Sequence, residues 1–215
     1  MNVFVAGATG YLGRALCDRL VSRGHRVTAL CRPGSARRVP PGTTPAPGDA
    51  LDAAALASAL ASDMTLVHLV GVSRPAPWKE TQFRAVDLAS VKASLEAAGR
   101  AGVRRMVYVS VAHPAPVMGA YIRVRCECEQ LIRSSGLAAT ILRPWYVLGP
   151  GHRWPAALIP IYRLLEWLPS TREAAARLGL VTRAQMTAAL AWAVEHPAAE
   201  VRILDVPGIR RAAQC

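Results

Sequence analysis

Long apolar runs are missing from this sequence. No uninterrupted stretch approaches the ~20 apolar residues that a membrane-spanning helix requires. A strand pattern begins at residue 2, with no basic segment and apolar leader ahead of it, so nothing resembles a secretory signal. We therefore expect a protein without a membrane span that is located in the cytoplasm.

Paired cysteines are also lacking. The five cysteines are scattered and odd in number, and none forms a CxxC motif, which argues against a disulfide framework and against a zinc site. Cys126 and Cys128 are two apart, and on a helix that spacing points their side chains to different faces. We expect small core or surface thiols and no metal site.

Lysine is almost absent: Lys79 and Lys92 are the only ones, although the formal net charge is +12 at pH 7. The positive charge is carried by arginines spread along the whole chain, not gathered into one block. Nucleic-acid binding through this charge remains an alternative, and it would give an affinity that falls steeply with added salt. The even spread makes nucleic acid an unlikely partner.

What the sequence does contain is a regular alternation of strand and helix patterns over 215 residues. We expect strands at residues 2–6, 26–31, 65–70, 105–110, 138–142 and 201–206, with a short third strand inside 33–48. We expect helices at residues 11–23, 51–61, 81–98, 119–134, 156–168 and 183–195. This order predicts one α/β domain over residues 1–215, with a parallel sheet covered on both faces.

Three glycines lie at the first strand-to-helix turn, in "VAGATGYLGRAL" at residues 5–16. The free N–H groups of the following helix and its dipole favour a phosphate at this end. Gly7 would permit the tight turn, Gly10 the close approach of a pyrophosphate, and Gly13 the packing of helix on strand. The whole turn is predicted to bind a nucleotide: Gly7, Ala8, Thr9, Gly10, Tyr11, Leu12 and Gly13.

The motif GATGYLG resembles the nucleotide-binding turn of the short-chain dehydrogenase/reductase superfamily, in its extended and atypical branches. Three later stretches agree: "VYVS" at 107–110, "YIRVRCECEQLIRSSGLAATILRP" at 121–144 and "LGLVTRAQMTAALAWAVEHP" at 178–197. They are similar to NmrA-like and complex-I-subunit-like NAD(P)H-binding proteins over nearly the full chain. The resemblance implies a Rossmann-type, doubly wound, three-layer α/β/α fold with strand order 3-2-1-4-5-6 and a dinucleotide across the strand ends.

The residues after the second strand favour NADP over NAD. An NAD-selective site usually carries an acid there to hold the ribose 2′-hydroxyl. This chain instead reads "ALCRPGSARR", with Arg32, Arg37 and Arg38 and no carboxylate. A guanidinium binds a 2′-phosphate through two parallel charge-assisted hydrogen bonds. By its place in the family pattern, Arg32 is preferred as the phosphate contact.

Other nucleotide contacts follow from the resemblance alone. "GDALD" at 48–52 is similar to the turn that lines the adenine, and "HLVG" at 68–71 matches the turn beside the adenine ribose. Pro144 follows the sixth strand in the same pattern, and Ser110, Tyr121 and Arg125 count among the implied contacts as well as the catalytic candidates. The implied contacts in the two turns are Asp49, Ala50, Leu51, Val70 and Gly71.

The superfamily's catalytic pair is a tyrosine and a lysine four residues apart on one helix face, and here it reads Tyr121 and Arg125. A cation ~4 Å from a tyrosine supplies on the order of 4 kcal/mol at an effective dielectric near 20, enough to bring its pKa from ~10 to ~7. A planar guanidinium nevertheless does not replace an ammonium at the ribose. Ser110 is the candidate third member, and His113 could donate a hydrogen bond nearby.

Two functions remain open at this point. One is an NADP(H)-dependent oxidoreductase acting on a small carbonyl or quinone-like compound. The other is a non-catalytic NADP(H)-binding redox sensor or assembly protein, favoured by Arg125 and by the reduced substrate or partner region at 145–200. That region offers Trp154, Tyr162 and Trp167, while Glu166 and Asp205 have no partners that spacing identifies. The helices at 81–98 and 119–134 correspond to those that the superfamily often pairs between subunits, so the resemblance also implies a possible homodimer.

Overall fold

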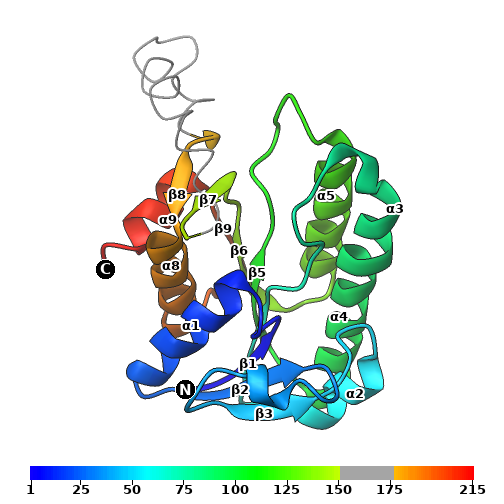
Figure 1. The fold of residues 1–215 in the computed structure, drawn as a ribbon, viewed down its shortest axis with the longest axis vertical. Helices are drawn as coiled ribbons and strands as arrows, with labels where there is room; N and C mark the ends of the chain where they lie inside the picture. The colour runs from blue at the N-terminus through cyan, green and yellow to red at the C-terminus, as the bar shows by residue number, and fades with distance from the viewer. Residues whose placement is uncertain (151–176) are drawn as a thin grey trace.

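A parallel β-sheet forms the centre of the molecule (Figure 1). The computed structural model describes residues 1–150 and 177–215, and within these ranges seven strands form this sheet in the order β3-β2-β1-β4-β5-β6-β9. The strands are β1 (Asn2–Ala6), β2 (Arg26–Cys31), β3 (Thr44–Pro47), β4 (Thr65–His68), β5 (Arg105–Val109), β6 (Ala138–Leu142) and β9 (Val201–Leu204). The expected order 3-2-1-4-5-6 is confirmed, and β9 extends it beyond β6.

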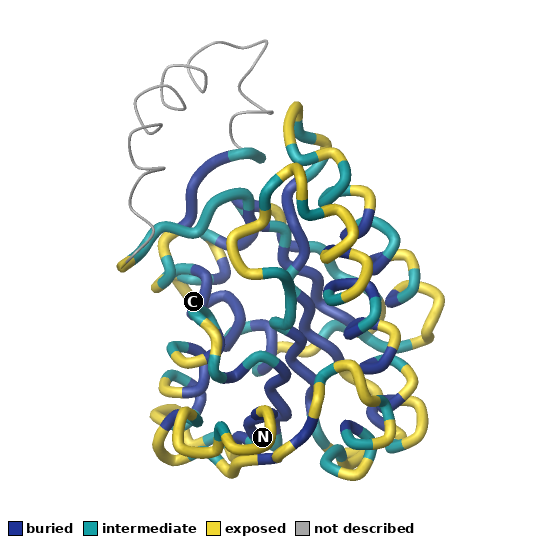
Figure 2. The backbone as a smooth tube through the Cα atoms, turned by 45° about the vertical axis from the view of Figure 1, so that its right-hand side comes forward, coloured by how far each residue is buried: buried dark blue, intermediate teal, exposed yellow. Residues whose placement is uncertain are grey.

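Helices cover both faces of the sheet (Figure 1). One layer holds α1 (Tyr11–Ser22), α8 (Arg183–Glu195) and α9 (Val206–Ala212), and the other holds α2 (Ala53–Ala59), α4 (Ala89–Ala101) and α5 (Gly119–Ser134). Strand β1 serves both layers because successive side chains point to opposite faces: Val3 and Val5 pack into the core under α1 and α8, and Phe4 packs under α2 and α4. Figure 2 shows the resulting buried centre between exposed outer turns.

Helix α8 is apolar around most of its circumference, as expected of a helix buried on several sides. It packs against α1 on one side and α9 on the other, and eight of its thirteen residues are buried. Thr182 caps its N-terminus: its hydroxyl accepts from the Gln185 N–H at 3.1 Å while the Gln185 side chain accepts from the Thr182 N–H at 2.9 Å. Helix α8 therefore joins the first and last helices into one layer.

Several predicted elements match the structure while others differ at their ends. Helices α5 and α8 and strand β6 have the predicted bounds. Helix α2 begins two residues later than predicted because the Asp52 carboxylate caps it, accepting from the N–H groups of Ala54 and Ala55. The predicted strand at 201–206 stops at Leu204, where Asp205 caps α9, a helix that the sequence analysis missed.

The helix predicted at residues 81–98 is a continuous helical segment in which an α-helical turn, a π-helical turn and a longer α-helix follow one another. It starts with α3 (Glu80–Gln82), widens into the π-helical turn η3 (Phe83–Leu88), and continues as α4. Two 3₁₀ turns, η1 (Ala36–Arg38) and η2 (Pro77–Lys79), lie in the loops after β2 and β4. A π turn inside a helix marks a functional site in many proteins, and η3 is taken up again below.

A second, two-stranded parallel sheet pairs β7 (Tyr146–Leu148) with β8 (Leu180–Thr182), two strands that the sequence analysis did not predict. The predicted helix at 156–168, which contains Tyr162, Glu166 and Trp167, lies outside the described residues, as does Trp154. In the parts of the chain that the structure describes, no helix is both long enough and apolar enough to cross a membrane.

Candidate functional site

The glycine turn after β1 has the geometry that its sequence predicts. Gly7 has a φ of +91°, a conformation that side chains other than glycine rarely adopt. The Gly10 N–H donates to the Gly7 carbonyl at 3.0 Å and closes the turn. A Cβ on Gly13 would lie 2.1 Å from the Gly7 oxygen and 2.7 Å from the Ala8 Cα. Gly13 is therefore required for the close packing of α1 on the turn.

The N-terminus of α1 is left open by this turn. Gly10 is its N-cap, and among the described residues no side chain caps it and no acid occupies its first turn. Its N–H groups and the positive end of the helix dipole therefore face the pocket without a competing negative charge. This arrangement fits a dinucleotide phosphate, which binds helix N-termini in this way.

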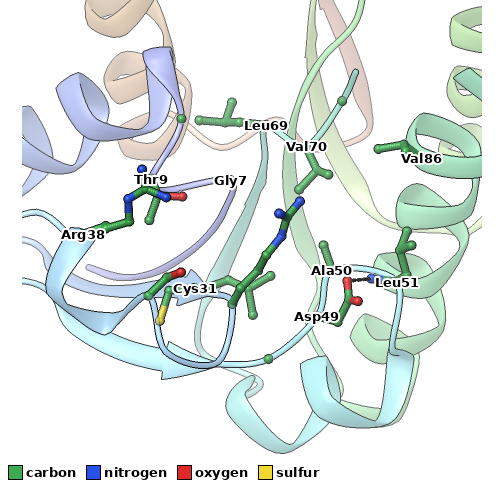
Figure 3. Close-up of a pocket in the computed structure, with 16 residues that line it drawn as sticks. Gly7, Thr9, Cys31, Arg38, Asp49, Ala50, Leu51, Leu69, Val70 and Val86 are labelled. Carbon is green, nitrogen blue, oxygen red and sulfur yellow. Dashed lines mark hydrogen bonds between the residues drawn. The ribbon is translucent and has the colours of Figure 1, made fainter. Parts of the chain in front are cut away.

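A pocket of about 470 Å³ opens at the glycine turn and extends across the carboxyl ends of β1, β2 and β4. Its lining includes nine of the predicted nucleotide contacts: Gly7, Thr9, Gly10, Arg32, Asp49, Ala50, Leu51, Val70 and Gly71. It also includes seven residues that were not among them: Leu30, Cys31, Ser35, Arg38, Gly48, Leu69 and Val86. Figure 3 shows Thr9 and Arg38 on one side of this pocket and Asp49, Ala50 and Leu51 on the other.

Two arginines, Arg32 and Arg38, line the pocket beyond the end of β2. Both are exposed at the surface, so neither guanidinium is confined by the core. Arg38 is the last residue of the turn η1, and Ser35, just before this turn, also lines the pocket. The Asp49 carboxylate lies on the opposite side and accepts a hydrogen bond from the Leu51 N–H at 3.0 Å, within its own turn (Figure 3).

The other predicted contacts lie outside the pocket lining. Ala8 is fully buried beneath the turn, and the Pro144 carbonyl accepts from the Ala112 N–H at 2.9 Å. The Tyr11 ring packs under the Arg183 guanidinium, with 5.2 Å between Cζ and the ring centroid. Leu12 packs against the core under α1. Ala8, Tyr11 and Leu12, with Gly13, belong to the glycine turn and the start of α1, whereas Pro144 follows β6.

Tyr121 lies in the first turn of α5, between an aromatic ring and a cation. Its ring is 4.9 Å from that of Phe83, and the Arg125 Cζ is 5.1 Å from its centroid. Burial raises the pKa of Tyr121 above its ordinary value of 10, and the Arg125 charge offsets this only in part. The lowering toward 7 considered from the sequence is wrong for this structure: the hydroxyl stays protonated at neutral pH.

The Arg125 guanidinium is buried and held by several groups at once. Its Nη1 donates to the Tyr108 hydroxyl and to the Val109 carbonyl, each at 2.9 Å. Its Nη2 forms an ion pair with the Asp87 carboxylate at 2.5 Å. The guanidinium thus stacks beside Tyr121 while its hydrogen atoms are directed toward the protein interior.

Ser110, the candidate third catalytic residue, is buried at the end of β5. Its hydroxyl donates to Glu129 Oε1 at 2.6 Å, and Arg143 donates to both oxygens of the same carboxylate. His113 Nε2 lies 3.5 Å from Glu129 Oε1. Although burial opposes it, hydrogen bonds from Arg143 and Ser110 lower the pKa of Glu129. The carboxylate is therefore ionised, and the Ser110 proton is directed at it.

The functional positions that the sequence analysis missed are brought in by the tertiary fold. Val86 and Asp87 come from the π turn η3, and Glu129 comes from the second half of α5. The i, i+4, i+8 spacing of Tyr121, Arg125 and Glu129 was available as a signal, because it puts all three on one helix face. No local pattern marks Asp87, since its partners lie 15 and 38 positions along the chain.

Comparison with known proteins agrees with this geometry. A family model described as NAD(P)H-binding matches residues 7–153. A 3-diazoavenalumate denitrifying reductase from a Streptomyces species is 33% identical over 180 residues, covering 70% of this chain and 58% of that protein. A 4-hydroxy-2-methyl-3-oxo-4-farnesyl-3,4-dihydroquinoline-1-oxide ketoreductase from Stigmatella aurantiaca is 29% identical over 171 residues, covering 69% and 51%. The chain thus spans little more than half the length of these curated relatives.

Solved structures show the same fold. A short-chain dehydrogenase/reductase superfamily protein from Agrobacterium tumefaciens, solved with bound NAD, matches 95% of this chain and 77% of its own. The TM-score is 0.68 at 20% sequence identity. At this identity the likeness establishes the three-layer Rossmann-type architecture, which the sheet order supports independently.

Proposed function

The chain belongs to the NAD(P)H-binding family, and we propose that it is a short-chain dehydrogenase/reductase-type, NADP(H)-dependent reductase of a small carbonyl or quinone-like compound. The observation that carries the proposal is the pocket between the glycine turn and the two arginines after β2. Two curated relatives named as reductases, one of them a ketoreductase, support the type of reaction.

The preference for NADP rests on charge at one end of the pocket. Arg32 and Arg38 offer two guanidinium groups where a ribose 2′-phosphate would lie. The carboxylate of the lining, Asp49, is across the pocket and bonded to its own turn. Charge-assisted bonds to phosphate are about twice as strong as neutral ones, so the 2′-phosphate would add affinity that NAD lacks.

Within this proposal, each group of the site has a defined task. The helix N-terminus at Gly10 holds the diphosphate, and the chemistry supplied by the bound reduced nucleotide is hydride donation to the substrate. Tyr121 gives its hydroxyl proton to the substrate oxygen. Its raised pKa suits this role, because a protonated phenol is a proton donor and a poor base. Arg125 orients Tyr121 by stacking on its ring.

A second candidate function, a non-catalytic NADP(H)-binding sensor or assembly protein, is favoured by the state of Arg125 and Ser110. Arg125 Nη1 donates to Tyr108 and Val109, its Nη2 pairs with Asp87, and the Ser110 hydroxyl donates to Glu129. Both Nη groups of Arg125 and the Ser110 hydroxyl are therefore already engaged with protein groups in this arrangement. The expected homodimer or protein partner stays a prediction under either function.

One experiment separates the two functions. NADP⁺, NADPH and NAD⁺ are titrated into the protein by calorimetry, and NADPH oxidation is then followed against a panel of ketones and quinones. The reductase proposal expects turnover that Tyr121→Phe reduces by at least about 100-fold while nucleotide affinity stays within about twofold. Tight binding without turnover across the panel would favour the sensor. Failure to bind any of the three nucleotides would contradict both functions.

The pH profile tests the role of Tyr121 further. Because its pKa is raised, the hydroxyl stays protonated, and the rate of ketone reduction is expected to be flat from about pH 6 to 9. A rate that falls through pH 7 would mean that the tyrosine ionises near neutrality, which would contradict the proton-donor role described here.

A further inference from the structure

A buried carboxylate lies between two donors beside the nucleotide pocket. Asp87 has no solvent exposure. Its Oδ2 accepts from the Val72 N–H at 3.0 Å, and its Oδ1 faces Arg125 Nη2 at 2.5 Å. Val72 belongs to the loop after β4 and Arg125 to α5, so the Asp87 side chain connects this loop to α5.

These contacts lie directly behind the pocket wall. Gly71, next to Val72, and Val86, next to Asp87, both line the pocket. A Cβ on Gly71 would lie 2.4 Å from Arg125 Nη2 and 3.0 Å from Asp87 Oδ1. The wall is therefore one residue thick here, and the ion pair is the layer beneath it. Figure 3 shows Val70 and Val86 facing the pocket from their two different elements.

The ion pair is itself fixed from behind. Arg125 is anchored to the end of β5 through Tyr108 and Val109. Asp87 lies in the π turn η3, whose wider path sets it apart from the regular helix on either side. Neither partner can move without breaking a buried contact. The loop at Val72 is therefore fixed relative to β5 through Asp87 and Arg125.

We propose that Asp87 is a positioning residue of the nucleotide site: paired with Arg125, it holds the loop at residues 70–72 in the shape that the nucleotide requires. The inference rests on the nucleotide binding described above and extends it to a residue that does not line the pocket. A wall held in its bound shape before binding spares the nucleotide the cost of ordering it.

The chemistry of the side chain makes this testable. A carboxylate has two acceptor oxygens, one for each donor, whereas an amide has one acceptor and one NH₂ donor. In Asp87→Asn the amide satisfies either Val72 or Arg125 and places its own donor against the other. If Arg125 is also replaced by methionine, the amide has only Val72 to satisfy. Arg125→Met alone leaves a buried carboxylate without its cation, the most unfavourable of these arrangements.

The experiment is a double-mutant cycle read by calorimetric titration with NADP⁺, at a temperature where circular dichroism shows every variant folded. Asp87→Asn is expected to weaken binding at least about tenfold in the wild-type background. In the Arg125→Met background the same change is expected to strengthen binding. This reversal of sign identifies the pair, because a general loss of stability would weaken binding in both backgrounds.

Two further variants keep the test decisive. Asp87→Glu retains both charges but displaces the carboxylate by a methylene, so it is expected to weaken NADP⁺ binding at least about threefold even if Asp87→Asn folds poorly. Glu80→Gln is the matched control. Glu80, in α3, forms an exposed ion pair with Arg123, which is on the same helix as Arg125; Glu80 Oε1 lies 3.1 Å from Arg123 Nη2. The control is expected to leave the affinity unchanged.

A second readout follows the loop itself. Hydrogen exchange at the Val72 amide is expected to be faster in Asp87→Asn than in the Glu80→Gln control. Wild-type affinity in both Asp87→Asn and Asp87→Glu would overturn the inference, whatever their melting temperatures. Failure of the wild-type protein to bind NADP⁺ or NAD⁺ would instead count against the nucleotide site, so the two failures are distinguishable.

Discussion

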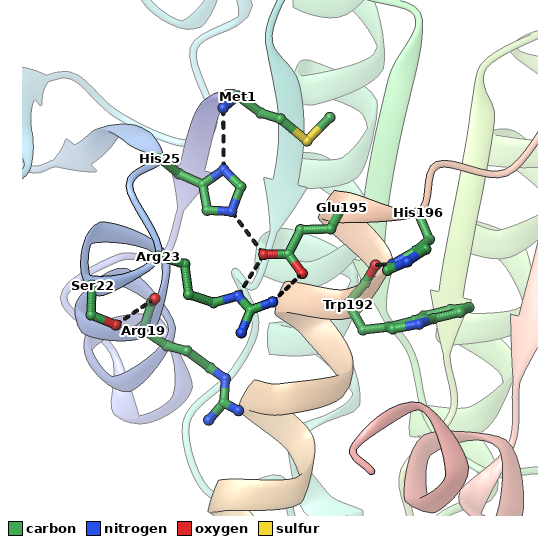
Figure 4. A network of polar contacts seen from close by, with 8 residues as sticks. All are labelled: Met1, Arg19, Ser22, Arg23, His25, Trp192, Glu195 and His196. Atoms are coloured by element: carbon green, nitrogen blue, oxygen red, sulfur yellow. Dashed lines mark hydrogen bonds and ion pairs between the residues drawn. The ribbon is translucent and has the colours of Figure 1, made fainter. Parts of the chain in front are cut away.

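The Glu195 carboxylate at the end of α8 accepts two hydrogen bonds from the Arg23 guanidinium just after α1 (Figure 4). The two N–O distances are 2.6 Å for Nε to Oε1 and 2.8 Å for Nη2 to Oε2. His25 Nε2 lies 2.9 Å from the same Oε1. Residues 172 positions apart are thus joined in a bidentate pair, which fastens α8 to the helix that carries the nucleotide turn.

The pair makes stability depend on pH. Hydrogen bonds from Arg23, with a smaller contribution from His25, lower the pKa of Glu195 from 4.5 to about 2. Its stabilising contribution is therefore complete above pH 4.5 and is lost as the pH falls toward 2. Glu195→Gln is expected to lower the melting temperature by about 3 °C at pH 7, with the difference disappearing at the acid end of that window.

The control for this measurement is Glu96→Gln, which removes an exposed ion pair with Arg100 on α4. Surface pairs of this kind contribute little, so no measurable change in melting temperature is expected at either pH. A Glu195→Gln melting curve that tracks wild type at neutral pH would show that the connection between α1 and α8 does not depend on this carboxylate.

Gly13→Ala tests the packing of the nucleotide turn. The added Cβ would meet backbone atoms of Gly7 and Ala8, which cannot move aside as a flexible side chain can. Overpacking of this kind costs about 1–3 kcal/mol in the free energy of unfolding, and displacement of α1 should abolish nucleotide binding. Denaturant unfolding and calorimetric titration measure the two effects.

Gly99→Ala is the matched comparison, because Gly99 is also helical and a Cβ there meets nothing within 4 Å among the described residues. Alanine exceeds glycine in helix propensity by up to about 1 kcal/mol, so this variant is expected to be as stable as wild type or more stable, with normal binding. Equal behaviour of the two variants would refute the packing role of Gly13.

The cofactor preference is predicted to depend on Arg32 and Arg38. Replacing either by alanine should weaken NADP⁺ binding at least about tenfold, the loss of a charge-assisted phosphate contact. Binding of NAD⁺, which has no 2′-phosphate, should change by less than about twofold. Arg37→Ala removes the same charge from a residue outside the pocket lining and serves as the control. An equal loss for both nucleotides would argue against a phosphate contact.

Much of the fold could be predicted from local sequence because its signals are local. Helix α5 has its predicted bounds because apolar residues recur at helical spacing and a glycine follows its end. Helix α9 was missed because Val-Pro-Gly after Asp205 is typical of a turn. Pro near a helix start and an Asp cap are nevertheless both helix-start signals. Strands β7 and β8 pair across more than 30 residues, and three-residue strands leave too short a pattern to detect.

The site divides in the same way. Gly7, Gly10 and Gly13 are found because one turn contains all the atoms that constrain them. The partners of Arg125 come from different elements, so a single sequence shows its charge and spacing but not that Asp87 and Tyr108 bind it. Arg32 was ranked above Arg38 from its place in the family pattern, and that Arg38 also lines the pocket is a tertiary feature that the sequence does not show.

The layer that α8 forms between α1 and α9 has a consequence for biosynthesis. Helix α1, which follows the nucleotide turn, is made well before α8, the helix against which it packs. Such distant contacts slow folding, because a long loop must close before they form. A ribosome-bound chain lacking residues 183–212 would leave the apolar side of α1 uncovered, and so competence for the dinucleotide would emerge only after this later segment has been made.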